Sequence, residues 1–153
     1  MADIVVVDVR PVLLVHRPRN EVAAFMFDPR NDAAWTTGVV SARPLTDGRL
    51  RVGSRVERTV KFLGRRFSYT YEVVAADPDR FVEMTVTQPF PMHVRYDLAD
   101  AAEGTRTSIH ATGEARGFFR LAAPFMNRMV RRNIAADLSN LKTLLESRPA
   151  SSV

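Results

Sequence analysis

Apolar and polar positions divide the chain into strand-like and helix-like stretches. β-branched residues crowd the segment 3–15, which favours a strand, and Pro11 within it indicates an edge position or a bulge, because proline donates no backbone hydrogen bond. Six further strands are expected at 39–45, 55–63, 66–75, 81–88, 92–99 and 105–115. Consecutive strands with short connections are typical of an antiparallel sheet.

Two short helices are expected between the first two strands. Pro18 opens the first helix, where its missing N–H has no partner to lose. Asp28 is predicted as the N-cap of the second, with Pro29 at its first position. This second helix carries Trp35 and is expected to end near Gly38.

A long amphipathic helix is predicted over residues 118–146. At about 100° per residue, its apolar side chains form one stripe and its basic side chains lie opposite. The stripe contains Met126, Val130, Ile134, Leu141, Leu144 and Leu145. A sheet with one apolar face needs a cover, and this helix is the only element long enough. The pattern therefore predicts an α+β fold: a curved antiparallel sheet of about seven strands, two short helices after the first strand, and a long C-terminal helix over the sheet.

One charged residue falls on the apolar face of the central hairpin. A two-residue turn at Gly64-Arg65 would pair Arg58 with Tyr71 and place eight side chains of the two strands on one face. Apart from the tyrosines, Arg58 is the only polar residue among these eight. A guanidinium there is costly unless it is paired. Arg58 is interpreted as an anchor for a ligand carboxylate or phenolate. The alternative is an arginine at the sheet margin whose head reaches water.

Asp137 falls in the middle of the apolar stripe of the long helix, and Asn133 lies towards its edge. We expect Asp137 to face the sheet. It is interpreted as a buried polar group in a cavity, paired with Arg58 or with a ligand, or as a general base whose pKa burial raises. A structural hydrogen bond to a strand or to ordered water is the alternative.

The histidines predict no metal site. If Asp97 pairs with Arg106 across the last hairpin, His93 lies opposite His110 on a polar, solvent-facing surface. No third ligand is evident. The chain has no cysteine, which excludes disulfides, thiolate metal sites and cysteine nucleophiles. No cofactor is expected.

Composition describes an ordinary globular protein of 153 residues, with 46% apolar and 25% charged side chains. The net charge of +5 comes from scattered arginines rather than a basic block, so no nucleic-acid partner is expected. No signal peptide and no integral membrane segment are visible, which favours a cytoplasmic location. We expect one domain over residues 1–147 and a flexible tail over 148–153. The pattern is compatible with a homodimer.

The start of the long helix allows two interpretations. Phe118-Phe119 precede its basic face and Pro124 lies just inside it. This segment is either a mouth that touches a membrane or a hinge that packs on the edge of the sheet. We favour the hinge.

Several short motifs occur in an order that points to one family. They are Val15-His16-Arg17-Pro18 leading to Glu21-Val22, then Phe25, Asp28-Pro29, Asn31 and Trp35, then Val52-Gly53, Tyr71-Glu72-Val73 with Asp77-Pro78, and Leu141-Lys142 with Leu145-Glu146. In these features the chain resembles the START-like superfamily, also called SRPBCC, and within it the polyketide cyclase/dehydrase and lipid-transport group. The resemblance implies a helix-grip fold with a cavity between the sheet and the long helix. Members bind lipids, hormones or polyketides, and some are enzymes.

The leading functional hypothesis is binding or transport of a small hydrophobic ligand, such as a lipid, an isoprenoid or a polyketide-like aromatic. The alternative is an aromatase/cyclase-type enzyme that acts on a poly-β-ketone in the same cavity, and a third is an interaction module without a ligand. The balance leans away from an enzyme, since no triad, P-loop or inward-pointing histidine is apparent. The candidate lining residues are Trp35, Arg58, Tyr69, Tyr71, Met84, Tyr96, Phe125, Met129, Asn133 and Asp137.

Overall fold

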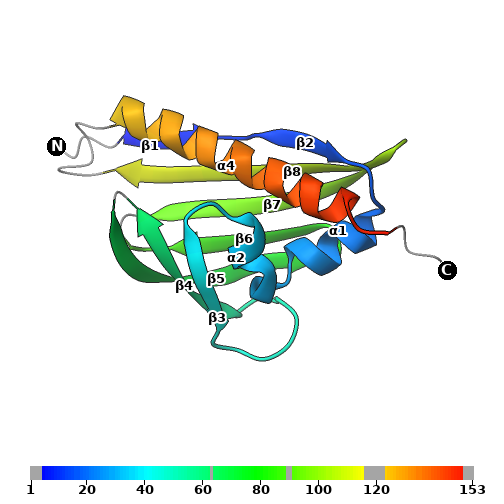
Figure 1. Ribbon diagram of the computed structural model, residues 1–153. Coiled ribbons are helices and arrows are strands. Elements are labelled where there is room, and N and C mark those ends of the chain that lie inside the picture. Colours follow the sequence, from blue (N-terminus) through cyan, green and yellow to red (C-terminus); the bar gives the residue numbers. More distant parts are fainter. Residues whose placement is uncertain (1–4, 63, 89–90, 116–122, 150–153) are drawn as a thin grey trace.

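A computed structural model describes residues 5–62, 64–88, 91–115 and 123–149. Its strands form one antiparallel sheet of eight strands in the order β1-β8-β7-β6-β5-β4-β3, and β2 also pairs with β8 (Figure 1). The strands are β1 (Val5–Val9), β2 (Val12–Val15), β3 (Val39–Pro44), β4 (Arg55–Phe62), β5 (Arg65–Asp77), β6 (Phe81–Val86), β7 (Met92–Ala101) and β8 (Gly104–Ala115). The helices are α1 (Arg19–Met26), the short 3-10 helix η1 (Pro29–Asn31), α2 (Asp32–Trp35) and α4 (Ala123–Glu146). The predicted α+β architecture is confirmed.

The expected first strand is two strands in line. Val9 pairs with Ala111 and Val12 pairs with Ser108, so the register along β8 is the same on both sides of the interruption. The interruption falls at Pro11, which lacks the N–H that a continuous ladder requires. Proline therefore marks an edge strand here rather than a bulge, and the strand count rises from about seven to eight.

Both predicted hairpin registers are wrong by two residues. Arg58 pairs with Tyr69 rather than with Tyr71, because the β4–β5 turn places Gly64, with φ of 77°, at its second position. Leu63, predicted to end a strand, lies outside the described residues. In the last hairpin, His110 faces Arg95 rather than His93. Side chains alternate with a period of two, so a two-residue error leaves every residue on its predicted face.

The long helix α4 covers only part of the sheet. It packs on β1, β2 and β8 and against α2, while α1 packs on β7 and β8 (Figure 1). Lys142 Nζ donates to the Leu14 carbonyl at 2.9 Å, and Arg17 Nη2 donates to the Glu146 carbonyl at 2.9 Å, which fastens the end of α4 to the β2 side. The predicted helical residues 118–122 lie outside the described part of the chain. No helix in the described part is long and apolar enough to cross a membrane.

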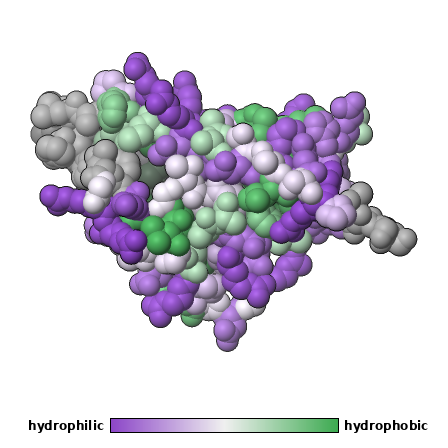
Figure 2. All heavy atoms as spheres, in the orientation of Figure 1, coloured by the Kyte–Doolittle hydropathy of each residue, from purple (hydrophilic) through white to green (hydrophobic). Residues whose placement is uncertain are grey.

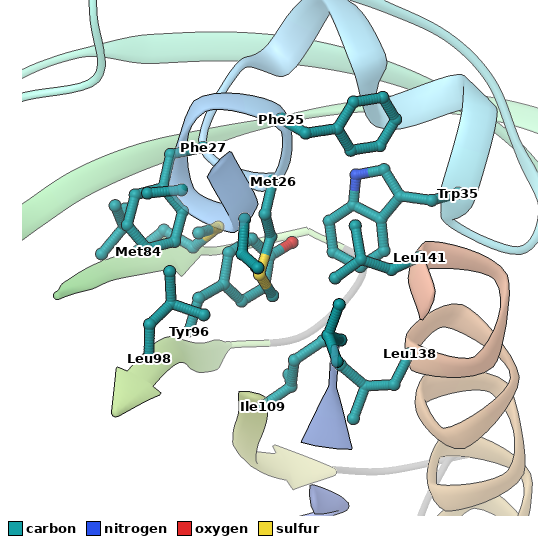
Figure 3. Packing of buried hydrophobic residues seen from close by; sticks show 14 of the residues in the cluster. Phe25, Met26, Phe27, Trp35, Met84, Tyr96, Leu98, Ile109, Leu138 and Leu141 are labelled. Atoms are coloured by element: carbon teal, nitrogen blue, oxygen red, sulfur yellow. The ribbon is translucent and has the colours of Figure 1, made fainter. Parts of the chain in front are cut away.

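The core lies where α1, α2 and the second half of α4 meet the sheet. Figure 3 shows side chains of these helices pointing towards those of the strands. Trp35 meets Tyr96 edge-on at 5.6 Å between ring centres, and Phe27 stacks on Tyr96 at 6.5 Å. Leu138 and Leu141 of α4 are fully buried in the same cluster. This packing places α2 against β3 and α4, with Trp35 reaching Tyr96 of β7.

Candidate functional site

Arg58 on β4 is the centre of a buried polar cluster. Its Nε and Nη2 each lie 2.9 Å from Asp32 Oδ2, in an ion pair that joins β4 to α2. Nη1 donates to the Tyr69 hydroxyl and Nη2 to the Tyr96 hydroxyl, both at 3.2 Å. The guanidinium carbon lies 4.8 Å from the centre of the Tyr71 ring. Four elements therefore meet at one guanidinium.

Local sequence explains how these side chains converge. The period of two places Arg58, Tyr69 and Tyr71 on the inner face of β4 and β5. Asp28 accepts a hydrogen bond from the Arg30 N–H at 3.0 Å, which caps the turn that begins at Pro29 and leads into α2. Asp32 starts α2 three residues before Trp35, so both side chains leave the same side of one helical turn. Both are buried.

Burial excludes the sheet-margin interpretation of Arg58, while its role as a ligand anchor stays a prediction. Only 8% of the residue is exposed, so the head group does not reach water at the sheet margin. A buried guanidinium requires a carboxylate, and Asp32 supplies it. Sequence reasoning missed Asp32. The available signals were its position three residues before Trp35 and the need of Arg58 for a partner.

The cluster shifts the protonation of its members. Burial raises the pKa of Asp32, and the charge of Arg58 opposes that shift. Burial also disfavours the charge of Arg58, but the surrounding oxygens of Tyr69, Tyr96 and Asp32 raise the pKa of Arg58 well above its usual value. Burial raises the pKa of Tyr96 to about 12, again against the effect of Arg58. The Tyr96 phenol therefore keeps its proton at neutral pH.

Asp137 of α4 is buried and faces α2. Its Oδ1 accepts a hydrogen bond from the Thr37 backbone N–H at 2.5 Å. Burial raises the pKa of Asp137, and the bond to Thr37 partly offsets this. Asp32 rather than Asp137 forms the ion pair with Arg58, and the charge of Arg58 also lowers the pKa of Asp137 slightly. Nearby, the Trp35 Nε1 has no hydrogen-bond partner within the described part of the chain.

Exposure divides the inner face of the sheet into two halves. In the packed half, beside α1 and α2, the inward side chains are buried: Val56, Tyr71, Val73, Val82, Met84, Tyr96 and Leu98. In the open half, the inward side chains of the same strands and the first half of α4 are only partly buried: Val60, Phe67, Tyr69, Val86, Val94, Val130 and Ile134. On each of the strands β4 to β7, the inward side chains pass from buried to partly exposed at the level of the Arg58 cluster. These side chains stay partly exposed to solvent, although Val86, Val94 and Ile134 still contact the core cluster.

The other candidate residues occupy different positions relative to the cluster. Met84 is buried beside Tyr96 in the packed core. Met129 and Asn133 are partly buried on the first half of α4, where the open half lies. Phe125 is 61% exposed and does not belong to the core. The structure thus brings Trp35, Arg58 and the three tyrosines together and leaves Phe125 apart.

Two hollows lie in the surface away from this cluster. One, of about 390 Å³, is bounded by α1, η1 and the β3–β4 loop, and the stacked Phe27 side chain separates it from Tyr96. The other, of about 620 Å³, is an open groove lined by charged side chains between the β2–α1 connection and the β7–β8 turn. Neither hollow is lined by Arg58.

The outer face of the sheet carries a ladder of charges. His93 Nε2 lies 3.1 Å from a Glu83 carboxylate oxygen, and His110 Nε2 lies 2.8 Å from Asp8 Oδ1. Arg95 bonds Asp97 at 2.7 Å and also contacts Glu83. Within the described ranges, no three acidic or histidine side chains converge as metal ligands do.

Family comparison agrees with this fold. The model of the family described as "Polyketide cyclase / dehydrase and lipid transport" matches residues 7–146. The chain belongs to this family. No curated protein matches it in sequence.

Solved structures with the same fold include two named for ring formation. The Zhui aromatase/cyclase from a Streptomyces species superposes with a TM-score of 0.80 at 16% identity, covering 97% of this chain and 99% of that one. The di-domain ARO/CYC StfQ of the steffimycin biosynthetic pathway gives 0.79 at 14% identity, covering 94% of this chain. The chain spans 52% of that di-domain protein. A third structure, the protein TTHA0849 from Thermus thermophilus, gives 0.78 at 15% identity, covering 92% and 97%. At these identities the likeness shows the fold alone.

Proposed function

We propose that the chain binds a small hydrophobic ligand in the open half of the inner face, between β4–β7 and the first half of α4. The observation that carries this proposal is the shared boundary at the Arg58 cluster. Four strands pass from buried to partly exposed inward side chains at that level. A folded chain with no occupant would gain free energy by closing such an apolar surface. The family description, which names lipid transport, supports the same function.

Tyr69 gives this ligand a polar contact. Its oxygen accepts a hydrogen bond from Arg58 and its ring is partly exposed on the open side of the boundary. A phenol that accepts one bond keeps its own O–H to donate, and the neighbouring guanidinium strengthens that donation. The preferred ligand therefore has an apolar body and an oxygen acceptor, such as a carbonyl, phenolate or carboxylate, at one end.

Native mass spectrometry of the purified protein, followed by denaturing extraction, tests this function. We expect a co-purifying apolar compound at near one-to-one ratio, or thermal stabilisation by some member of a panel of fatty acids, sterols and aromatic polyketides. Tyr69→Phe should weaken binding of oxygen-bearing ligands by about tenfold while leaving hydrocarbon analogues unchanged. Thr70→Val, which removes a hydroxyl from the opposite face of β5, is the matched control. An empty protein that no panel member stabilises contradicts the proposal.

A second candidate function is ring formation on a poly-β-ketone. It is favoured by the gathering of acid–base groups at the boundary, where Asp32 and Asp137 have raised pKa values and Tyr69 borders the open half. Two structural neighbours also carry aromatase/cyclase in their names. Incubation with a poly-β-ketone thioester should then yield a product lighter by water, faster than the spontaneous reaction. Binding without any acceleration favours a carrier.

A further inference from the structure

The exposed face of α4 has an unusual charge pattern. Its exposed positions include Arg128, Arg131 and Arg132 and no carboxylate. The two acidic residues of α4 are both engaged elsewhere: Asp137 is buried against Thr37, and Glu146 bonds Lys142 at 2.6 Å. No ion pair or side-chain hydrogen bond is described for the three arginines within residues 5–62, 64–88, 91–115 and 123–149.

Within the chain, this arrangement is unfavourable. Arg128 and Arg132 are four residues apart on one helix face, where like charges repel. All three arginines lie in the first half of α4. Asp8, whose backbone N–H bonds Asn127 at 3.4 Å, directs its carboxylate to His110 instead. The described contacts offer no intramolecular compensation for these charges.

A large apolar side chain stands among these charges. Phe125 is 61% exposed and precedes Arg128 and Arg132 by three and seven residues, which places all three on one face. In Figure 2, hydrophilic side chains project from the surface over the first half of α4 beside a hydrophobic patch. We call Phe125, Arg128, Arg131 and Arg132 the α4 basic face.

We propose that the α4 basic face docks the protein on an anionic phospholipid surface. Guanidinium groups pair with phosphate oxygens in a bidentate manner, and an exposed phenylalanine enters the headgroup region. The opposite stripe of the same helical segment, at Val130 and Ile134, borders the open half of the inner face. Docking through this segment would bring the apolar side chains of the open half close to the lipid surface.

The same features argue against single-stranded nucleic acid as the partner. Proteins that bind single strands use a concave basic groove with several stacking aromatics, whereas this face is a convex helix with one aromatic ring. The α4 basic face lies outside the open half, so the proposal stands independently of the proposed ligand function.

Co-sedimentation with vesicles tests the proposal, using phosphatidylcholine alone and phosphatidylcholine mixed with a minority of phosphatidylglycerol. We expect binding only to the anionic vesicles, and release as salt is raised. The triple variant Arg128→Gln/Arg131→Gln/Arg132→Gln should lose about 100-fold in partition coefficient, roughly fivefold per arginine. Arg55→Gln/Arg80→Gln/Arg106→Gln makes the same change of net charge at exposed positions away from α4 and should keep most of the binding.

A spectroscopic variant tests insertion directly. In Phe125→Trp, emission should shift to shorter wavelength on anionic vesicles and be quenched by brominated lipid, while the buried Trp35 contributes a constant background. Matching unfolding midpoints of all variants establish that the fold is intact. Four results overturn the proposal: no vesicle binding at low salt, equal binding to neutral vesicles, equal loss in both triple variants, or tighter binding of an oligonucleotide that the α4 triple variant abolishes.

Discussion

The packed and open halves of the inner face are made of the same strands and the same helix, yet they differ in how well their side chains are covered. The packed half is closed by α1, α2 and the second half of α4, and its side chains form one continuous core. The open half has similar side chains, Val and Phe among them, but they remain partly exposed. Composition alone does not distinguish the halves. The difference is that α1 and α2 also pack over the packed half, whereas the open half is bordered by α4 alone among the described helices.

The Arg58 cluster separates the two halves, and breaking its ion pair should have the largest effect. Asp32→Leu leaves a buried guanidinium without its carboxylate and is expected to lower the free energy of unfolding by about 3–5 kcal/mol. Urea unfolding followed by circular dichroism measures this loss. The double variant Asp32→Leu/Arg58→Met should recover most of it, since no unpaired charge remains. A double variant as unstable as the single one would show that the pair is not what stabilises the boundary.

Matched truncations on α4 should lower the free energy of unfolding more in the packed half than in the open half. Leu141→Ala, in the packed half, is expected to lower the free energy of unfolding by about 3 kcal/mol. Ile134→Ala, on the same helix and bordering the open half, should lower it by about half as much or less, because less contact is lost where the side chain is already partly exposed. Equal losses would mean that the open half is packed in solution.

Asp137 should make stability depend on pH. Because its pKa is raised in the folded state, the protonated carboxyl is favoured by folding, and its contribution is lost as pH rises from about 4 through the folded value. Asp137→Asn mimics the protonated form and retains an acceptor for Thr37. Thermal melts across pH should show the variant gaining stability relative to wild type as pH rises from acid to neutral. A constant difference across that range contradicts the raised pKa.

Filling the open half should have the smallest effect on stability and a large effect on ligand binding. Val94→Phe adds volume where the inward side chain is partly exposed, and is expected to change the free energy of unfolding by less than about 1 kcal/mol. In native mass spectrometry, the Val94→Phe variant should retain less ligand than the wild type, or none. Val74→Phe, at an exposed position of β5, is the control and should retain ligand.

The hairpin shows how far sequence patterns reach. The alternation around Arg58 placed it on the apolar face even though the predicted register was off by two residues, since a period of two tolerates that error. The partner of Arg58 was not found in the same way. Asp32 lies 26 residues earlier, on a helix of one turn, and no periodicity connects it to β4.

The long helix shows the same limit of sequence patterns. Its apolar stripe predicted that Asp137 would be buried, because helical geometry alone fixes which side chains share a face. It did not predict that Asp137 would bond the Thr37 backbone, since that contact depends on how α2 and α4 pack. The same geometry places Phe125 opposite the stripe, in agreement with its exposure and against its choice as a lining residue.

The sequence by itself therefore determined the order of elements, the face that each residue occupies and the presence of a costly arginine on an apolar face, since these follow from local geometry and side-chain chemistry. The tertiary structure decided which carboxylate meets that arginine, where α4 stops covering the sheet, and which half of the inner face stays open. Those outcomes depend on contacts between segments far apart in the chain, and close packing of whole elements selects them.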